Sequence, residues 1–289
     1  MRHGLPARGI AAGCVVLALA LPATAQTPAE RAAQVLSAAR QAMGGDKVNG
    51  ITSILATGRT QRVRGDNLVP IEFEIAVELP DKYVRKDEVP AEETDSLTGF
   101  VGSEPIGAAP APGRPGGPGA RPGGPGARPG GPGGRPGGPP QTPEARLNAA
   151  KQDFARLALG IFAGSVDTFP MTFAFAAQAQ APQGTASVLD VKGPGNFAAR
   201  LFIDDQTHLP IMLTWPGPPT APQGAQGGTA PQGPPSDNRL YYADYRDVNG
   251  VKLPFRLRRA VGSDTTEETT FDRFRLNTRI DPRKFAPAR

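Results

Sequence analysis

Residues 239–285 read RLYYADYRDVNGVKLPFRLRRAVGSDTTEETTFDRFRLNTRIDPRKF, and this stretch decides the fold. Asn249-Gly250 is the strongest short signal for a β-hairpin, because both central positions of a type I′ turn need a positive φ. After the turn, apolar residues alternate with arginines from 253 to 258, which is the period of a half-buried antiparallel strand. A second turn at 262–264 returns the chain into a third strand. The stretch therefore predicts a β-meander with one apolar and one charged face.

Two helices are expected in the rest of the chain. The first begins at Thr27, an N-cap that forms a capping box with Glu30, and it ends at Gly44-Gly45 because glycine adopts the left-handed C′ conformation easily. The second begins at Thr142, again followed by proline at the first helical position, and its apolar face reaches about Phe162.

Strands make up most of the remaining sequence. Four are expected before the second helix, at 51–64, 71–79, 83–87 and 97–101. Four more precede the meander, at 171–177, 186–191, 197–203 and 209–215. Consecutive strands joined by short turns favour one antiparallel sheet, and two helices cannot cover both of its faces. We expect an α+β fold: a large curved antiparallel sheet, an unclosed β-barrel, with two helices in its concave face.

Residues 1–25 have the pattern of a secretory signal peptide. An apolar run at 10–21 follows basic residues, and Ala23 and Ala25 form a small-residue cleavage site. The run is about 12 residues long, short of the roughly 20 that a spanning helix needs. We expect cleavage after Ala25 and a periplasmic or secreted, soluble product.

Cys14 offers an alternative, because residues 11–14 faintly resemble a lipoprotein processing site. The apolar run continues beyond Cys14 to Leu21, which favours ordinary cleavage after Ala25 instead. If Cys14 leaves with the leader, the remaining chain has no cysteine, and therefore no disulfide and no thiol nucleophile.

The expected single domain, 26–289, is interrupted by two segments of biased composition. Residues 105–141 contain a repeated RPGGPGA unit, and residues 216–237 are rich in Pro, Gly and Gln. Neither carries the large apolar side chains that would offset the entropy of ordering it, so both are expected to be disordered inserts. Collagen is excluded because a seven-residue repeat does not place glycine at every third position.

The net charge of +5 comes mainly from the leader and the first insert. Removing Arg2 and Arg8 leaves +3, and removing the four arginines of the repeat leaves −1. A nucleic-acid partner is therefore not indicated, and the repeat lacks the aromatics that stack on bases. The alternative to a purely solvated loop is a basic tether that touches an anionic envelope surface through Arg114, Arg121, Arg128 and Arg135.

Several motifs together resemble the LolA-like family of periplasmic proteins, which includes outer-membrane lipoprotein carriers. They are Met43–Lys47 (MGGDK), the strand 51–59, LFIDDQTHLP at 201–210, YADYRDVNGVKLP at 242–254, and NTRID at 277–281 followed by Phe285. The resemblance covers most of the chain after the leader, outside the two inserts. It implies an unclosed antiparallel barrel whose helices cover an apolar cavity that accepts acyl chains.

The residues that support catalysis or metal binding are scarce. His208 is the one histidine after the leader, and it lies in an expected turn beside Asp204 and Asp205. A metal site from these three is conceivable, but a polar turn explains them better. Asp244 and Asp247 lack the motif of a general acid/base pair. We expect no enzyme, no metal and no cofactor; a hydrolase based on carboxylates would require clustered acids in a cleft.

We therefore expect an exported, non-enzymatic protein that binds a lipid or lipoprotein acyl chain in an apolar cavity. The alternative is an envelope sensor or scaffold that binds a protein partner. An open cavity would favour the first, and a filled core with an exposed apolar strand edge the second. The candidate cavity residues, which could equally be core, are Val35, Leu36, Met43, Leu157, Phe162, Ile203, Leu213, Trp215, Tyr242, Phe255 and Leu257.

Overall fold

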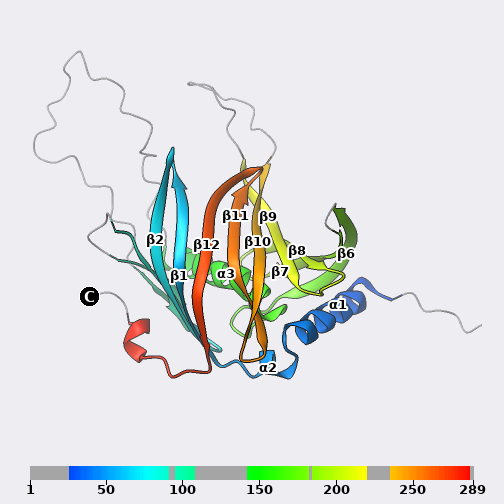
Figure 1. Ribbon diagram of the computed structural model, residues 1–289, viewed down its shortest axis with the longest axis horizontal. Helices are drawn as coiled ribbons and strands as arrows, with labels where there is room; N and C mark the ends of the chain where they lie inside the picture. Colours follow the sequence, from blue (N-terminus) through cyan, green and yellow to red (C-terminus); the bar gives the residue numbers. More distant parts are fainter. Residues whose placement is uncertain (1–25, 91–94, 108–141, 182–183, 220–234, 287–289) are drawn as a thin grey trace, which may run out of the picture.

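The computed structural model of the protein describes residues 26–90, 95–107, 142–181, 184–219 and 235–286. Within these residues the chain forms one 12-stranded antiparallel sheet with helices beside it (Figure 1). The strand order is β5-β4-β3-β2-β1-β12-β11-β10-β9-β8-β7-β6. The two edge strands of the described sheet do not pair with each other, so the sheet is open. The expected α+β fold with an unclosed, curved sheet is confirmed.

The sheet consists of two meanders that meet where β1 pairs with β12. The first meander contains β1 (Ser53–Arg64), β2 (Asn67–Glu78), β3 (Lys82–Glu88), β4 (Ser96–Val101) and β5 (Glu104–Ile106). The second contains β6 (Thr172–Ala181), β7 (Gly184–Gly193), β8 (Phe197–Asp204), β9 (Pro210–Pro219), β10 (Pro235–Val248), β11 (Val251–Val261) and β12 (Asp264–Leu276). Asn249 and Gly250 have φ of 57° and 83°, as the expected hairpin turn requires.

The strands extend into both ranges that were expected as inserts, so those boundaries were wrong. In the first range, β5 pairs with β4, and Ile106 is buried because it packs against a small cluster on the convex face. In the second range, β9 extends to Pro219 and β10 begins at Pro235, and these two prolines are register partners. Proline cannot donate to a ladder, and the register shift that follows Pro235 accommodates it.

The leader with Cys14, the arginine repeat at 108–141 and residues 220–234 lie outside the described residues. The helices are α1 (Pro28–Met43), α2 (Asp46–Asn49), α3 (Pro143–Phe162) and the 3₁₀ helix η1 (Pro282–Phe285). The capping box of α1 is confirmed, since Thr27 N donates to Glu30 Oε2 at 2.8 Å and Glu30 N donates to Thr27 Oγ1 at 3.2 Å. None of the described helices is long and apolar enough to cross a membrane.

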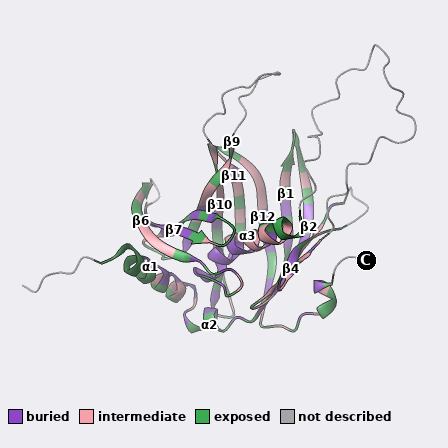
Figure 2. Cartoon of the chain, turned by 180° about the vertical axis from the view of Figure 1, so that it is seen from behind, coloured by how far each residue is buried: buried purple, intermediate pink, exposed green. Residues whose placement is uncertain are grey.

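Helix α3 crosses the concave face from one edge of the sheet toward the other. Its first turn lies beside β5, where Arg146 Nη1 donates to the carbonyl of Gly107 at 3.0 Å, and β6 begins ten residues after its end. A flat sheet of this size would hold its edges roughly 50 Å apart, whereas a 20-residue helix is about 30 Å long. Curvature lets the helix contact β4 and β5 at one edge as well as β9 and β11 further along the sheet, whereas β6 at the other edge contacts α1. Figure 2 shows α3 in the middle of the concave side and α1 beside β6.

Two tyrosines of β10 hold α3 against the sheet. The hydroxyl of Tyr242 donates to the carbonyl of Arg156 at 2.5 Å. The hydroxyl of Tyr245 donates to the carbonyl of Pro210 at 2.8 Å and also lies 3.3 Å from the carbonyl of Gly160. The ring of Tyr242 lies directly against Gly160, where an added Cβ would come within 2.3 Å of a ring carbon. Glycine at this position therefore sets how deeply the helix enters the concave face.

We predict that Gly160→Ala destabilises the protein by about 1–3 kcal/mol, because the new methyl group overlaps the Tyr242 ring. Helix propensity alone would give the opposite sign, a gain of about 1 kcal/mol. Urea unfolding measures the change. The matched control is Gly50→Ala, where a Cβ meets its nearest neighbour at an ordinary 3.6 Å. Equal effects of the two substitutions would contradict the close contact.

Candidate ligand-binding site

A pocket of about 180 Å³ lies between α3 and the concave face of the sheet. Its wall combines two kinds of side chain, a set of charged groups and an apolar set. The charged groups are Arg62, Arg85, Asp87, Asp153, Arg156, Arg259 and Glu267. The apolar side chains are Ile75, Leu157, Leu240, Leu257 and Phe271, and Tyr83, Thr98 and Thr269 complete the lining. The pocket is thus an apolar floor with a charged wall.

One row of cross-strand neighbours explains how the two sets meet. Reading across the sheet from β6 to β1, the register partners are Phe175, Leu189, Leu201, Leu213, Leu240, Arg259, Glu267 and Arg62. Residues opposite one another on antiparallel strands point to the same face, so the whole row lies on the concave face. We call residues 189, 201, 213 and 240 the leucine row. Along this row the side chains change from apolar to charged at one step, between Leu240 on β10 and Arg259 on β11.

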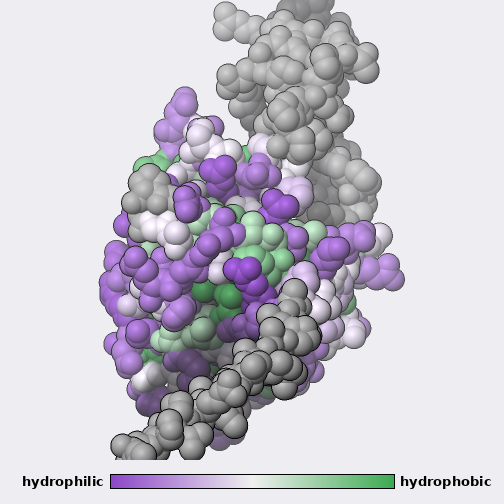
Figure 3. All heavy atoms as spheres, turned by 90° about the vertical axis from the view of Figure 1, so that its right-hand side faces the viewer, coloured by the Kyte–Doolittle hydropathy of each residue, from purple (hydrophilic) through white to green (hydrophobic). Residues whose placement is uncertain are grey.

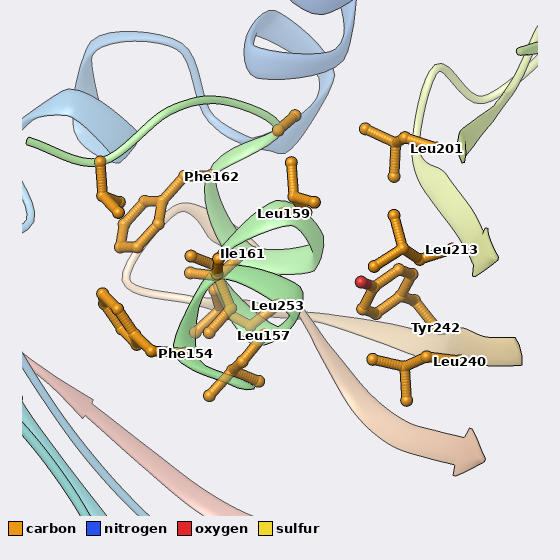
Figure 4. Packing of buried hydrophobic residues seen from close by; sticks show 14 of the residues in the cluster. Phe154, Leu157, Leu159, Ile161, Phe162, Leu201, Leu213, Leu240, Tyr242 and Leu253 are labelled. Atoms are coloured by element: carbon orange, nitrogen blue, oxygen red, sulfur yellow. The ribbon is translucent and has the colours of Figure 1, made fainter. Parts of the chain in front are cut away.

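The side chains of the leucine row pack against α3. Leu201 and Leu213 have no exposed surface, and Leu240 is 5% exposed. Figure 4 shows Leu213, Leu240 and Tyr242 extending from the strands toward the helix, with the hydroxyl of Tyr242 pointing at it. Most of the protein's core therefore lies between a helix and one face of a sheet.

The charged wall contains two tight ion pairs on the side of β1, β3 and β12. Arg62 Nε lies 2.9 Å from Glu267 Oε2, and Arg85 Nε lies 2.6 Å from Asp87 Oδ1. Arg85 also donates to Thr60 Oγ1 at 3.0 Å, and that oxygen shares a buried hydrogen bond of 2.9 Å with Thr269. These hydrogen bonds fix the positions of the cations on this side.

Burial and neighbouring charges shift several pKa values in the pocket. Burial raises the pKa of Glu267, but Arg85, Arg62 and Arg259 outweigh burial and hold it below the usual value. Burial also raises the pKa of the Tyr83 hydroxyl far above its usual value. Burial lowers the pKa of the Arg156 guanidinium; Asp153 raises it and Arg259 lowers it again. The charged groups of the pocket thus act on one another, and Arg156 and Arg259 are two cations close enough to repel.

The structure brings the predicted cavity residues into one hydrophobic cluster but not into one open cavity. Eight of them are buried in it: Leu36, Met43, Leu157, Phe162, Ile203, Leu213, Tyr242 and Phe255. Val35, Trp215 and Leu257 are half-buried and pack against the cluster. Leu157 and Leu257 line the 180 Å³ pocket, and Phe162 lines a separate pocket of about 410 Å³ at the end of α3. Small-molecule sites usually have about 300–1,000 Å³, so the concave face is largely filled in this conformation.

The turn at Asp204 is a polar turn, as expected. Asp204 Oδ1 accepts hydrogen bonds from the backbone N–H groups of Gln206 and Thr207 and from the Thr207 hydroxyl, and His208 has a φ of 57°. Within the described part of the chain, no cluster of three or more His, Cys, Asp or Glu could hold a metal ion.

The charged wall of the pocket was not predicted from the sequence. The alternation that placed Leu253, Phe255 and Leu257 on the apolar face also places Arg259 there, two residues further along β11. That signal was available. The position of Asp153 and Arg156 beside Arg259 could not be predicted from the sequence, because it depends on how α3 lies across the sheet.

Compared by sequence, the chain matches no known family profile and no curated protein. Compared by structure, it is similar to a LolA superfamily protein from Nitrosomonas europaea, with a TM-score of 0.51 and 10% identity over 91% of this chain and 98% of that one. The chain has a LolA-like fold. The resemblance expected from the strand and turn motifs is confirmed at the level of the fold.

Two further solved structures are similar. A DUF1329 family protein from Desulfovibrio piger has a TM-score of 0.46 and 8% identity, covering 90% of this chain and 98% of that one. A domain from Vibrio parahaemolyticus with a proposed role in outer-membrane lipoprotein sorting has a TM-score of 0.48 and 11% identity, covering 88% and 94%.

We predict that Glu267→Gln lowers stability at neutral pH by about 1–3 kcal/mol, because Arg62 loses a charged partner. The pKa of Glu267 is lowered on folding, so its contribution is present above its unfolded pKa and disappears as the pH falls through the folded value. The variant should therefore lose less stability than the native protein between about pH 5 and pH 3. Urea unfolding at each pH measures this.

The matched control for this experiment is Glu268→Gln. It removes the neighbouring carboxylate on the opposite face, whose partner Arg256 is 56% exposed. Exposed pairs contribute little, about 0–1 kcal/mol. If Glu267→Gln and Glu268→Gln had the same stability at every pH, the Arg62–Glu267 pair in the pocket would stabilise the fold no more than the exposed Arg256–Glu268 pair does.

Proposed function

We propose that this is an exported, non-enzymatic binding protein that holds a lipid or lipoprotein acyl chain between α3 and the leucine row. The observation that carries the proposal is the pocket itself, which has an apolar floor continuous with the leucine row and lies under a helix. The similar structures include a LolA superfamily protein and a domain with a proposed role in lipoprotein sorting, which fits an envelope role.

The size of the pocket means that a long acyl chain can bind only if the protein changes conformation. A volume of about 180 Å³ is below the usual range for a ligand site, so a long chain enters only when α3 moves away from the sheet. Burying about 15 methylene groups gains roughly 12 kcal/mol, which offsets the loss of the helix's contacts with the leucine row. The acyl chain replaces the side chains of α3 as the apolar partner of the sheet.

A different feature favours the second candidate, a protein partner bound at the edge of the sheet. Strand β6 is the last strand in the order, its ten residues TFAFAAQAQA carry no charge, and within the described residues it pairs only with β7. Uncharged edge strands are templates for pairing with another chain. Figure 3 views the side on which α1 and β6 lie and shows hydrophobic surface in the middle of it, with hydrophilic surface around.

The experiment that tests the lipid proposal has two parts. Mass spectrometry of organic extracts from protein purified without detergent should identify a stoichiometric lipid. The purified protein should also take up a fluorescent fatty acid. A protein that carries no lipid and takes up no fatty acid would overturn the proposal, and crosslinking to a protein partner at β6 would then support the second candidate.

We predict that Leu257→Trp weakens uptake of the fluorescent fatty acid at least tenfold, because the indole fills the pocket that the half-buried Leu257 lines. The matched control is Ile211→Trp, which adds the same ring beside Tyr241 and Arg258, outside the 180 Å³ pocket. This control should bind within twofold of the native protein. Equal affinity for all three proteins would place the acyl chain elsewhere.

A further inference from the structure

Arg156 of α3 and Arg259 of β11 share a single carboxylate. Arg156 Nη1 lies 2.9 Å from Asp153 Oδ1, which is a normal ion pair. Arg259 Nη2 lies 3.9 Å from the same oxygen, which is too long for a hydrogen bond. Arg259 therefore has no close ion pair with Asp153, and the other carboxylate that it faces, its register partner Glu267, is already paired with Arg62.

The other charged groups of the pocket do not supply the missing anion. Arg62 is paired with Glu267 and Arg85 with Asp87, so these four balance one another. The seven charged side chains of the pocket consist of four arginines and three carboxylates, which leaves one positive charge. This excess lies on the side of Arg156 and Arg259, and it agrees with the way Arg259 lowers the pKa of Arg156.

Both arginines also have unused hydrogen-bond donors. Among the described residues, the Nε atoms of Arg156 and Arg259 are buried and have no hydrogen-bond partner. The two guanidinium groups lie over the same ring, that of Trp215, at 4.6 and 5.8 Å from its centroid. The ring holds them close together through cation–π contacts. Two cations held side by side with free donors form a binding site for an oxyanion, because the guanidinium fork matches carboxylate and phosphate geometry.

We propose that Arg156 and Arg259 bind the anionic head, a carboxylate or a phosphate, of an amphiphilic ligand whose chain lies on the apolar floor of the pocket. This inference rests on the proposed function and adds the chemical class of the ligand's head. The register of the sheet supports this inference. Arg259 is the register partner of Leu240, which is the last residue of the leucine row. A single molecule that lies across the boundary between Leu240 and Arg259 has its chain on the leucine row and its head at the two arginines.

The test measures the affinity of the full-length protein for oleate and for oleyl alcohol by calorimetry at pH 8, where the acid is ionised. The two ligands have the same chain and differ in the head. We expect oleate to bind at least tenfold more tightly than oleyl alcohol. An oleoyl lysophosphatidic acid tests a phosphate head on the same chain, and inorganic phosphate tests the free anion.

The variants separate a direct contact from a structural role. Arg259→Met should weaken oleate binding at least tenfold and leave oleyl alcohol within twofold, and Arg259→Lys should recover part of the loss. Asp153→Asn should strengthen oleate binding at least threefold, because it removes the carboxylate that competes for both arginines. The matched control is Arg59→Met, which removes an exposed arginine outside the pocket and should change neither affinity.

Each outcome decides between clear alternatives. Equal affinity of the native protein for oleate and oleyl alcohol, or equal effects of Arg259→Met and Arg59→Met, would overturn the head-group site while leaving the acyl-chain proposal intact. Failure to bind any of the chain-bearing ligands would overturn both. If millimolar inorganic phosphate displaced oleate from the native protein, the site would take a free anion, and the amphiphile would be the wrong ligand. Tighter binding of the lysophosphatidic acid than of oleate would assign the head as a phosphate.

Discussion

The contact between Gly160 of α3 and the ring of Tyr242 on β10 is the constraint on which the rest of the structure depends. Because Gly160 has no side chain, the helix backbone approaches the strand closely enough for the Tyr242 hydroxyl to reach the carbonyl of Arg156. Arg156 and Gly160 are one helical turn apart and therefore lie on the same face of α3. The same contact thus sets the depth of the helix in the sheet and the position of the guanidinium group above the pocket.

A protein built in this way has its core between a helix and one face of an open sheet. The leucine row and the apolar side of α3 pack against each other, and in the proposed function an acyl chain replaces α3 as the partner of the row. The charged residues follow directly in the same row, so the concave face offers an apolar region and a cationic region to one ligand. The proposed ligand, an amphiphile with a negatively charged head, matches both regions: its chain matches the apolar region and its head matches the cationic one.

The sequence predicted the local structure well, because local signals are short and specific. The positive φ values at Asn249 and Gly250 and the capping box at Thr27 were found where expected. The apolar and charged alternation was extended too little, so Arg259 was assigned to neither face. The pairing of β1 with β12 joins residues about 200 positions apart, such as Arg62 and Glu267, and no local pattern encodes it. The charged wall depends on that pairing and on the path of α3, so it could be seen only in three dimensions.

Hydrogen exchange in α3, measured with and without oleate, tests the central claim most directly. We predict that the amides of residues 150–162 exchange through a local opening that requires less free energy than the opening of β10 and β11. Oleate should change the protection of these helix amides while leaving the strands unchanged. Exchange of α3 and the sheet only through global unfolding, with no response to oleate, would contradict a helix that gives way to a ligand.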